Sequence, residues 1–218
     1  MVAELLTGHP PSREFAELLR PETLPDGTDP EERLILCGLS WQRYLDLDRA
    51  LGDDRPGPRF YYLESDLEIM TTSNEHERIK KWIGGFVEDY FLHFDTEIIP
   101  RGQATMRLML QEAGAEPDES WCVGEDKEFP NLVLEIALTS GGLRKLEIYR
   151  RFGVREVWFW RRNALEIFAL RPDGSGYEPA AKSHLLPQLD VALLERCVKL
   201  ASWTEARRAF RARLAAGK

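Results

Sequence analysis

The chain has 218 residues, of which 43% are hydrophobic and 30% are charged, and its formal net charge is −8. This length and composition predict one globular domain of medium size with appended helices rather than two full domains. The negative charge argues against a general nucleic-acid coat protein, which is usually basic, but it is compatible with a nuclease that has a local basic cleft.

The sequence has no run of eighteen or more apolar residues, and residues 1–11 lack the charged start and apolar stretch of a secretion signal. We therefore expect a cytoplasmic protein with no membrane span. Cys37, Cys122 and Cys197 are far apart and lack the spacing of metal ligands, which predicts reduced structural thiols.

The first part of the chain predicts an arm followed by a helix and a hairpin. Residues 1–38 are rich in Pro, Glu and Asp, which is typical of an irregular N-terminal arm. A helix is expected after Ser40 and should end at Gly52. Two short strands, 60–63 and 67–70, then predict a hairpin.

The most strongly patterned helix is expected to begin next. Asn74 and Glu77 have the spacing of a capping box and predict its start. Its apolar residues fall on one stripe, which we expect to pack on a sheet. The stripe consists of Ile79, Trp82, Ile83, Phe86, Val87, Tyr90 and Phe91.

The rest of the chain predicts a sheet and two final helices. Strands are expected near residues 97–99, 103–110, 117–123, 132–138, 156–160 and 165–170. A helix over 143–152 separates the fourth and fifth of these, so we expect a βαβ crossover in a mostly antiparallel sheet. Helices are expected over 190–201 and 204–215. The predicted organisation is an N-terminal arm (1–38), an α/β domain (39–189) and a C-terminal helical extension (190–218).

The last stretch is basic, because seven Lys and Arg residues face only Glu205 between residues 196 and 218. A solvated helix face is the simplest interpretation of this charge. The aromatic run 157–160 favours a core strand or a dimer interface over a platform on which bases stack. Gly141 and Gly142 are interpreted as a flexible strand-to-helix turn rather than a phosphate site.

Glu135 is the most informative residue, because it lies alone in the apolar run 131–138, which is typical of a central buried strand. The alternation of a strand puts Glu135 on one face between Val133 and Ala137, which leaves room beside it. An unpaired buried carboxylate is costly, so Glu135 needs a cation, a metal ion or a proton.

Asp118 and Lys145 are expected to lie near Glu135. Asp118 stands at the start of the preceding strand, and Lys145 shares a helical face with Ile148 and Tyr149, which points it inward. Two carboxylates on adjacent strands with a lysine suit phosphodiester hydrolysis, because hard oxygen ligands bind a magnesium ion that activates water. A buried salt bridge without chemistry is an equally good interpretation of these residues.

Six segments occur in a fixed order along the chain: Tyr61 to Met70, Ser73 to Glu77, Glu116 to Glu119, Glu135 to Ser140, Lys145 to Tyr149, and Phe152 to Trp158. This series, which covers roughly residues 40–189, resembles the Uma-two family of restriction-endonuclease-like proteins. The resemblance implies the PD-(D/E)XK nuclease-like fold. It also implies that Asp118 and Glu135 are the metal ligands, and we expect the Ile136 carbonyl to join them.

The lysine that such folds carry two residues after the strand Glu is absent, because that position is Ala137. The resemblance implies that this lysine has moved to the next helix, where Lys145 stands. Glu75 is a fourth candidate, since related folds place a metal-linked acid on this helix; alternatively it only complements the helix dipole. His76 is interpreted as a helix-start or supporting residue rather than as a base.

We therefore predict a magnesium- or manganese-dependent endodeoxyribonuclease in which Asp118, Glu135, Lys145 and Glu75 are catalytic. The alternative is a non-catalytic nucleic-acid-binding or oligomerisation module on a degenerate nuclease fold, which the acidic net charge and Ala137 favour. The expected partner is nucleic acid, most simply DNA. A homodimer is also expected, since cutting two strands suits a two-fold assembly.

Overall fold

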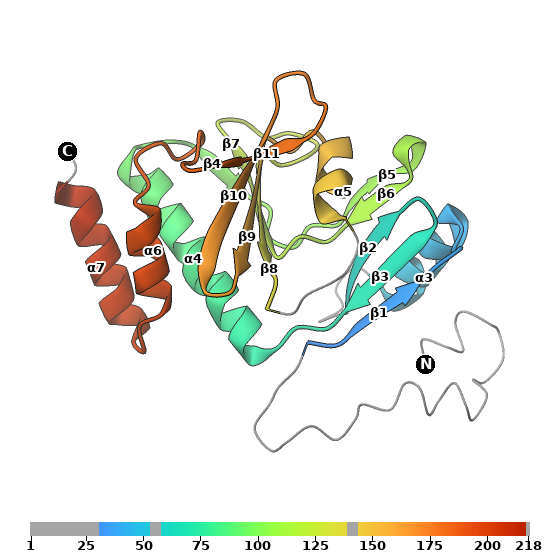
Figure 1. Ribbon diagram of the computed structural model, residues 1–218, viewed down its shortest axis with the longest axis horizontal. Coiled ribbons are helices and arrows are strands. Elements are labelled where there is room, and N and C mark those ends of the chain that lie inside the picture. Colours follow the sequence, from blue (N-terminus) through green and yellow to red (C-terminus); the bar gives the residue numbers. More distant parts are fainter. Residues whose placement is uncertain (1–30, 53–57, 139–143, 217–218) are drawn as a thin grey trace, which may run out of the picture.

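The strands of the computed structural model, which describes residues 31–52, 58–138 and 144–216, form two sheets (Figure 1). The smaller sheet has the order β1-β3-β2-β6-β5, from β1 (Arg33–Leu36), β2 (Arg59–Leu63), β3 (Asp66–Met70), β5 (Met106–Leu108) and β6 (Ala113–Ala115). The larger sheet has the order β11-β10-β9-β8-β7-β4, from β4 (Ile98–Pro100), β7 (Glu119–Val123), β8 (Leu132–Ile136), β9 (Glu156–Arg161), β10 (Ala164–Leu170) and β11 (Tyr177–Ala180).

The predicted βαβ crossover is confirmed. Strands β8 and β9 pair in parallel, with Leu132 opposite Glu156, and helix α5 (Lys145–Arg151) lies between them in the chain. Every other strand pair in the described residues is antiparallel. The crossover therefore fixes where the first residue of α5, Lys145, stands relative to β8.

The predicted first helix and hairpin are also confirmed. Helix α3 (Trp41–Leu51) begins after Ser40, whose hydroxyl accepts a hydrogen bond from the Arg43 amide at 3.4 Å. The hairpin of β2 and β3 turns at Glu64 and Ser65, whose φ angles of 48° and 78° suit a tight two-residue turn that follows the twist of the strands. Apolar residues of α3 and the hairpin form a core of their own.

The long helix α4 (Asn74–His93) begins one residue earlier than the predicted capping box requires. Ser73 is the cap: it keeps an extended backbone, and its hydroxyl accepts a hydrogen bond from the His76 amide at 3.1 Å. Asn74 is already helical, so the prediction that it caps the helix is wrong. The apolar stripe of α4 is buried against the larger sheet, as predicted.

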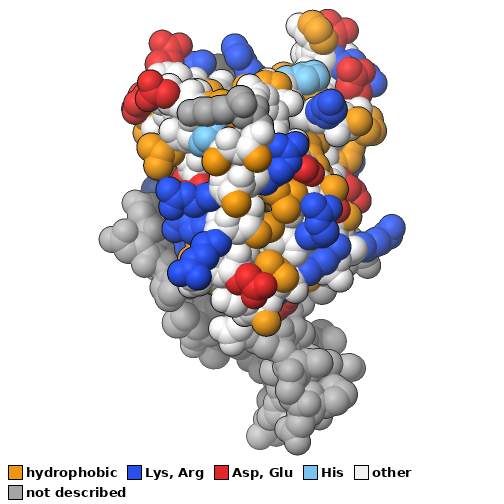
Figure 2. Space-filling view, turned by 90° about the vertical axis from the view of Figure 1, so that its left-hand side faces the viewer, with side chains coloured by type: hydrophobic (Ala, Val, Ile, Leu, Met, Phe, Trp, Pro, Cys, Tyr) orange, Lys and Arg blue, Asp and Glu red, His pale blue; other side chains and the backbone are white. Residues whose placement is uncertain are grey.

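Helices α6 (Val191–Val198) and α7 (Trp203–Ala216) cover the outer side of α4 and form one side of the molecule (Figures 1 and 2). A Cβ atom on Gly85 of α4 would lie 2.7 Å from the Trp203 ring, so glycine permits this close packing. Leu194 and Phe210 enter the same core as α4. The segment predicted as an extension therefore packs on the larger layer.

Three strands had no clear signal in the sequence. Residues 33–36, within the predicted arm, form β1 beside β3, while residues 1–30 of that arm lie outside the described residues. Strand β6 has the sequence Ala-Gly-Ala, which lacks the branched and aromatic residues typical of strands. Strand β11 contains Pro179, which is tolerated because β11 is an edge strand.

The two faces of β8 pack against different parts of the molecule, and the candidate site lies on one of them. Leu132, Leu134 and Ile136 pack in the core that α4 covers, as the alternation predicts. Val133 packs on the opposite face, in a core shared by α5 and the smaller sheet, and Glu135 follows the same alternation. Glu135 therefore lies between the two sheets. The neighbouring aromatic run 157–160 is buried in β9, between β8 and β10, which confirms a core strand and leaves no ring free for stacking on bases.

Candidate functional site

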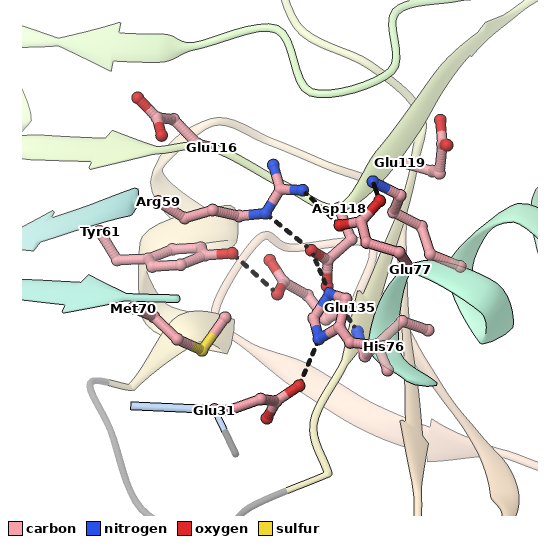
Figure 3. Close-up of polar contacts among 12 residues, drawn as sticks. Glu31, Arg59, Tyr61, Met70, His76, Glu77, Glu116, Asp118, Glu119 and Glu135 are labelled. Atoms are coloured by element: carbon pink, nitrogen blue, oxygen red, sulfur yellow. Dashed lines mark hydrogen bonds and ion pairs between the residues drawn. The ribbon is translucent and has the colours of Figure 1, made fainter. Parts of the chain in front are cut away.

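Two wholly buried carboxylates meet where the two sheets come together (Figure 3). Strands β7 and β8 are antiparallel with Glu119 opposite Leu134, and the same register puts Asp118 opposite Glu135. Residues opposite each other in such a pair have side chains about 5 Å apart. Asp118 and Glu135 are thus brought together by the pairing of the strands themselves.

Asp118 is held by a backbone amide and two side chains. Its Oδ2 accepts a hydrogen bond from the Ile136 amide at 2.7 Å, and its Oδ1 lies 2.8 Å from His76 Nε2 and 3.0 Å from Arg59 Nε. Burial raises the pKa of Asp118, but the hydrogen bond and charge of His76 and the charge of Arg59 outweigh it and lower this pKa to about 2. Asp118 is therefore ionised at neutral pH.

Glu135 accepts from a lysine and two tyrosines. Its Oε2 lies 2.7 Å from Lys145 Nζ and 3.0 Å from the Tyr61 hydroxyl, while Oε1 accepts from the Tyr149 hydroxyl. Burial and the like charge of Asp118 raise the pKa of Glu135, whereas the charge of Lys145 lowers it. The net effect is a raised pKa. The Lys145 ammonium also lies over the Tyr61 ring, 3.5 Å from its centroid.

His76 joins Asp118 to the segment before β1. Its Nδ1 lies 2.5 Å from Oε1 of Glu31, whose side chain is almost wholly buried. Burial lowers the pKa of His76, but the hydrogen bonds to Asp118 and Glu31 outweigh it and raise this pKa from 6.5 to about 9. A ring with a carboxylate at each nitrogen is protonated at neutral pH, so His76 supplies a positive charge beside Asp118.

A second set of charges surrounds Arg59. This side chain is nearly buried, and its Nη2 lies 3.5 Å from Glu77 Oε1. Glu77 also forms an ion pair with Lys80, which is wholly buried on α4. The cluster therefore balances its carboxylates with arginine from the smaller sheet and with histidine and lysine from two helices.

The structure places Glu75, the fourth candidate acid, away from the sheet. The Glu75 side chain is 54% exposed, and its Oε1 lies 2.6 Å from Arg78 Nη2. On α4 the residues that face the sheet are His76, Ile79 and Lys80, and Glu75 is rotated from His76 by about 100°. Glu75 thus lies outside the cluster.

Sequence reasoning missed several members of the cluster. Arg59 and Tyr61 belong to the hairpin, and Glu31 belongs to the predicted arm, so nothing in the sequence linked them to Asp118. Tyr149 had a usable signal, because it follows Lys145 by four residues and so shares its helical face. Gly141 and Gly142 lie outside the described residues.

The donors fit a hard divalent ion in kind. Among the described residues, no group of three or more His, Cys, Asp or Glu side chains is arranged to hold a metal. Magnesium, however, usually takes one or two carboxylates and completes its shell with water and substrate phosphate. A carboxylate has roughly four acceptor positions, and Asp118 and Glu135 each have three partners, so by this count each has the capacity for one more ligand.

A family model described as "Putative restriction endonuclease" matches residues 41–205, which is most of the chain and includes Arg59, His76, Asp118, Glu135 and Lys145. The chain belongs to the Uma2 family. The two sheets, the helices and the buried carboxylates are accordingly those of a restriction-endonuclease-like fold. Membership in the Uma2 family indicates a nuclease that acts on nucleic acid.

Two parts of the structure lie outside the Uma2 match. They are the segment that carries Glu31 and β1, and the larger part of α7. No curated protein matches the chain. Within the described residues, every helix is too short or too polar to cross a membrane.

Proposed function

We propose that the protein is a magnesium- or manganese-dependent endonuclease that hydrolyses phosphodiester bonds in DNA. The observation that carries this function is the 2.7 Å contact of Lys145 Nζ with Glu135 Oε2, on the strand next to ionised Asp118. Family membership supports nuclease chemistry, and the contact supports a particular set of residues for it.

Asp118 and Glu135 are the proposed ligands, with the Ile136 carbonyl as a third. Bound there, a divalent ion would neutralise charge that develops on the phosphate and lower the pKa of an attacking water. The chain's own residues keep the ligands in place: His76 and Arg59 orient Asp118, while Tyr61 and Tyr149 orient Glu135.

Lys145 is the proposed residue that orients the attacking water or assists removal of its proton. Its side chain is 11% exposed, so it can meet a substrate at the edge of the cluster while its ammonium remains against Glu135. The Tyr61 ring beneath the ammonium limits where it can move. This position supports a role in which one amine serves both a carboxylate and a reacting water.

The complete pairing of charges in the cluster favours a second candidate, a non-catalytic nucleic-acid-binding module. His76 and Arg59 already neutralise Asp118, and Lys145 already neutralises Glu135. An incoming ion would have to tolerate these cations or displace one of them. A binding module would retain nucleic acid without any metal, and salt would weaken this retention.

Cleavage of supercoiled plasmid, measured with Mg²⁺, with Mn²⁺ and with EDTA, tests the proposed function. We expect cutting with either ion and none with EDTA. Asp118→Asn should abolish cutting and still bind a DNA duplex, which would separate chemistry from binding. A parent protein that binds DNA but leaves the plasmid intact with both ions would favour the binding module.

Two controls make this test interpretable. Asp126→Asn removes an exposed carboxylate that pairs with Arg101, away from Asp118, and should cut like the parent. Thermal melting of each variant checks that it is folded. The homodimer expected from the sequence is measured separately by light scattering after size-exclusion chromatography, and a monomer at assay concentration would contradict that expectation.

A further inference from the structure

The outer face of α6 and α7 carries a concentration of positive charge in an otherwise acidic protein. Residues 196–216 contain six basic residues and one acid, Glu205. Figure 2 shows Lys and Arg side chains gathered on this side of the molecule, which faces the viewer. With a net charge of −8 for the whole chain, such a separation of charge creates a local positive field.

Four of these six basic residues have no ion pair within the described part of the chain. Arg207 forms two hydrogen bonds to Asp89, and Arg213 lies 3.6 Å from Asp190. The other four, which we call the basic face, are exposed and lack such partners: Arg196, Lys199, Arg208 and Arg211. Charges that serve only to hold helices together would be paired like Arg207.

The basic face leads toward the candidate site. Lys199 follows Val198, whose carbonyl accepts a hydrogen bond from Arg78 Nη1 at 3.3 Å. Arg78 belongs to the first turns of α4, two residues after His76 of the cluster. Arg78 itself is paired with Glu75, so the basic face ends at Lys199, beside the first turns of the helix that carries His76.

The basic face lacks the apolar groups with which proteins enter a lipid surface. Exposed large hydrophobic side chains in the described residues are Ile35, Leu92, Met109 and Leu138, and none of them lies on α6 or α7. Membrane-surface helices combine basic residues with exposed Leu, Phe or Trp. The face is instead polar, guanidinium-rich and exposed, which suits phosphate groups repeated along a nucleic-acid backbone.

We infer that the basic face holds the phosphate backbone of the nucleic-acid substrate away from the cleaved bond. This inference rests on the proposed action on nucleic acid and adds a surface to it. Contacts of this type position the substrate and carry no base recognition, so they should be independent of sequence. They also explain how an acidic protein would bind a polyanion.

The test measures binding of a fluorescent DNA duplex by anisotropy, in EDTA so that nothing is cut, from about 50 mM to about 200 mM salt. The double variant Arg208→Gln, Arg211→Gln should bind more weakly. Its slope of log affinity against log salt should be smaller than the parent's by roughly 1.8, from about 0.9 for each lost phosphate contact.

The matched control is Arg43→Gln, Arg49→Gln, which removes the same charge from exposed positions on α3, at the other side of the molecule (Figure 1). It should keep the parent's slope. Equal slopes for parent and Arg208→Gln, Arg211→Gln would overturn the inference, as would a parent protein that binds neither duplex nor single strand. Binding to anionic vesicles in place of DNA would also overturn it.

The experiments can overturn the proposed nuclease activity and the basic-face inference independently. If the parent cuts plasmid and the Arg208→Gln, Arg211→Gln variant binds DNA like the parent, only the inference about the basic face is overturned. If the parent binds DNA through the basic face but cuts with neither ion, only the proposed nuclease activity is overturned. The binding assay is done without metal and does not depend on cleavage. Thermal melting of the double variants shows that they are folded.

Discussion

Glu31 and His76 are 45 residues apart in the sequence, yet their Oε1 and Nδ1 atoms lie 2.5 Å apart. The other ring nitrogen of His76 faces Asp118, so one imidazole links the segment before β1 to a proposed metal ligand. Glu31 lies outside the part of the chain that matches the Uma2 family. A residue beyond the matched region therefore helps to orient a residue at the centre of the candidate site.

Glu31→Gln should lower the cleavage rate by about 10-fold to 100-fold, because supporting partners of metal ligands typically have effects of this size. Glutamine keeps the shape of the side chain but loses the charge that faces the imidazole. The matched control is Glu32→Gln, an exposed neighbour. Plasmid cutting measures the rate, and NMR signals of the His76 ring report its orientation without any activity. Unchanged ring signals in Glu31→Gln would contradict this role.

The stability of the protein should fall as pH rises from about 6.5 to about 9. The pKa of His76 is raised in the folded state to about 9 from 6.5, so its contribution is complete below pH 6.5 and is lost as pH rises through 9. The loss is on the order of 3 kcal/mol. Urea unfolding at several pH values measures it. The same curve for His76→Gln should be flatter, and a parent curve without any decline would count against a protonated His76.

Lys145→Met should lower the cleavage rate by about 10² to 10⁴, which is typical of a residue that assists proton transfer. Methionine also leaves Glu135 without a cation, and burial already raises the pKa of this carboxyl. Lys182→Met is the control, since Lys182 is exposed. Single-turnover cleavage of an oligonucleotide measures both. If folded Lys145→Met cuts at the parent's rate, this lysine has no part in the chemistry.

Adjacent glycines on α4 should respond to alanine in opposite ways. A Cβ on Gly84 meets its nearest neighbour at 3.7 Å, an ordinary contact, so Gly84→Ala should stabilise the helix by about 0.5 to 1 kcal/mol. A Cβ on Gly85 would lie 2.7 Å from Trp203, so Gly85→Ala should destabilise by about 1 to 3 kcal/mol. Urea unfolding compares the two. A stabilised Gly85→Ala would show that α7 does not pack closely on α4.

Local patterns in the sequence were sufficient to predict every strand of the larger sheet except β11, and the two carboxylates of that sheet. Glu135 interrupts an apolar strand, and Asp118 precedes the neighbouring strand, so both were found from residues close to them in the chain. Strand β6 was not predicted because its glycine answers a tertiary requirement: a Cβ on Gly114 would lie 2.5 Å from the Tyr44 hydroxyl. Partners such as Arg59 were not predicted for the same reason. Local hydrophobic periodicity does not show which residues of two sheets will face each other.

The position of Glu75 illustrates a different limit. Successive residues of a helix point about 100° apart, so the same apolar stripe can have either Glu75 or His76 at its first turn. Ser73 rather than Asn74 caps α4, and His76 rather than Glu75 faces the sheet. The existence and apolar face of the helix could be predicted from many residues, whereas the direction of one side chain in its first turn could not.

The cluster between the sheets also acts as their electrostatic joint. Arg59 and Tyr61 of the smaller sheet pair with Asp118 and Glu135 at the larger one, at 3.0 Å in each case. If the smaller sheet undocked, the larger layer would keep its own apolar core, but two acids that are now compensated would face water and lose their fixed orientation. The arrangement of the candidate site would therefore depend on docking of the smaller sheet. Local unfolding of the hairpin would disrupt the site while most of the fold remained.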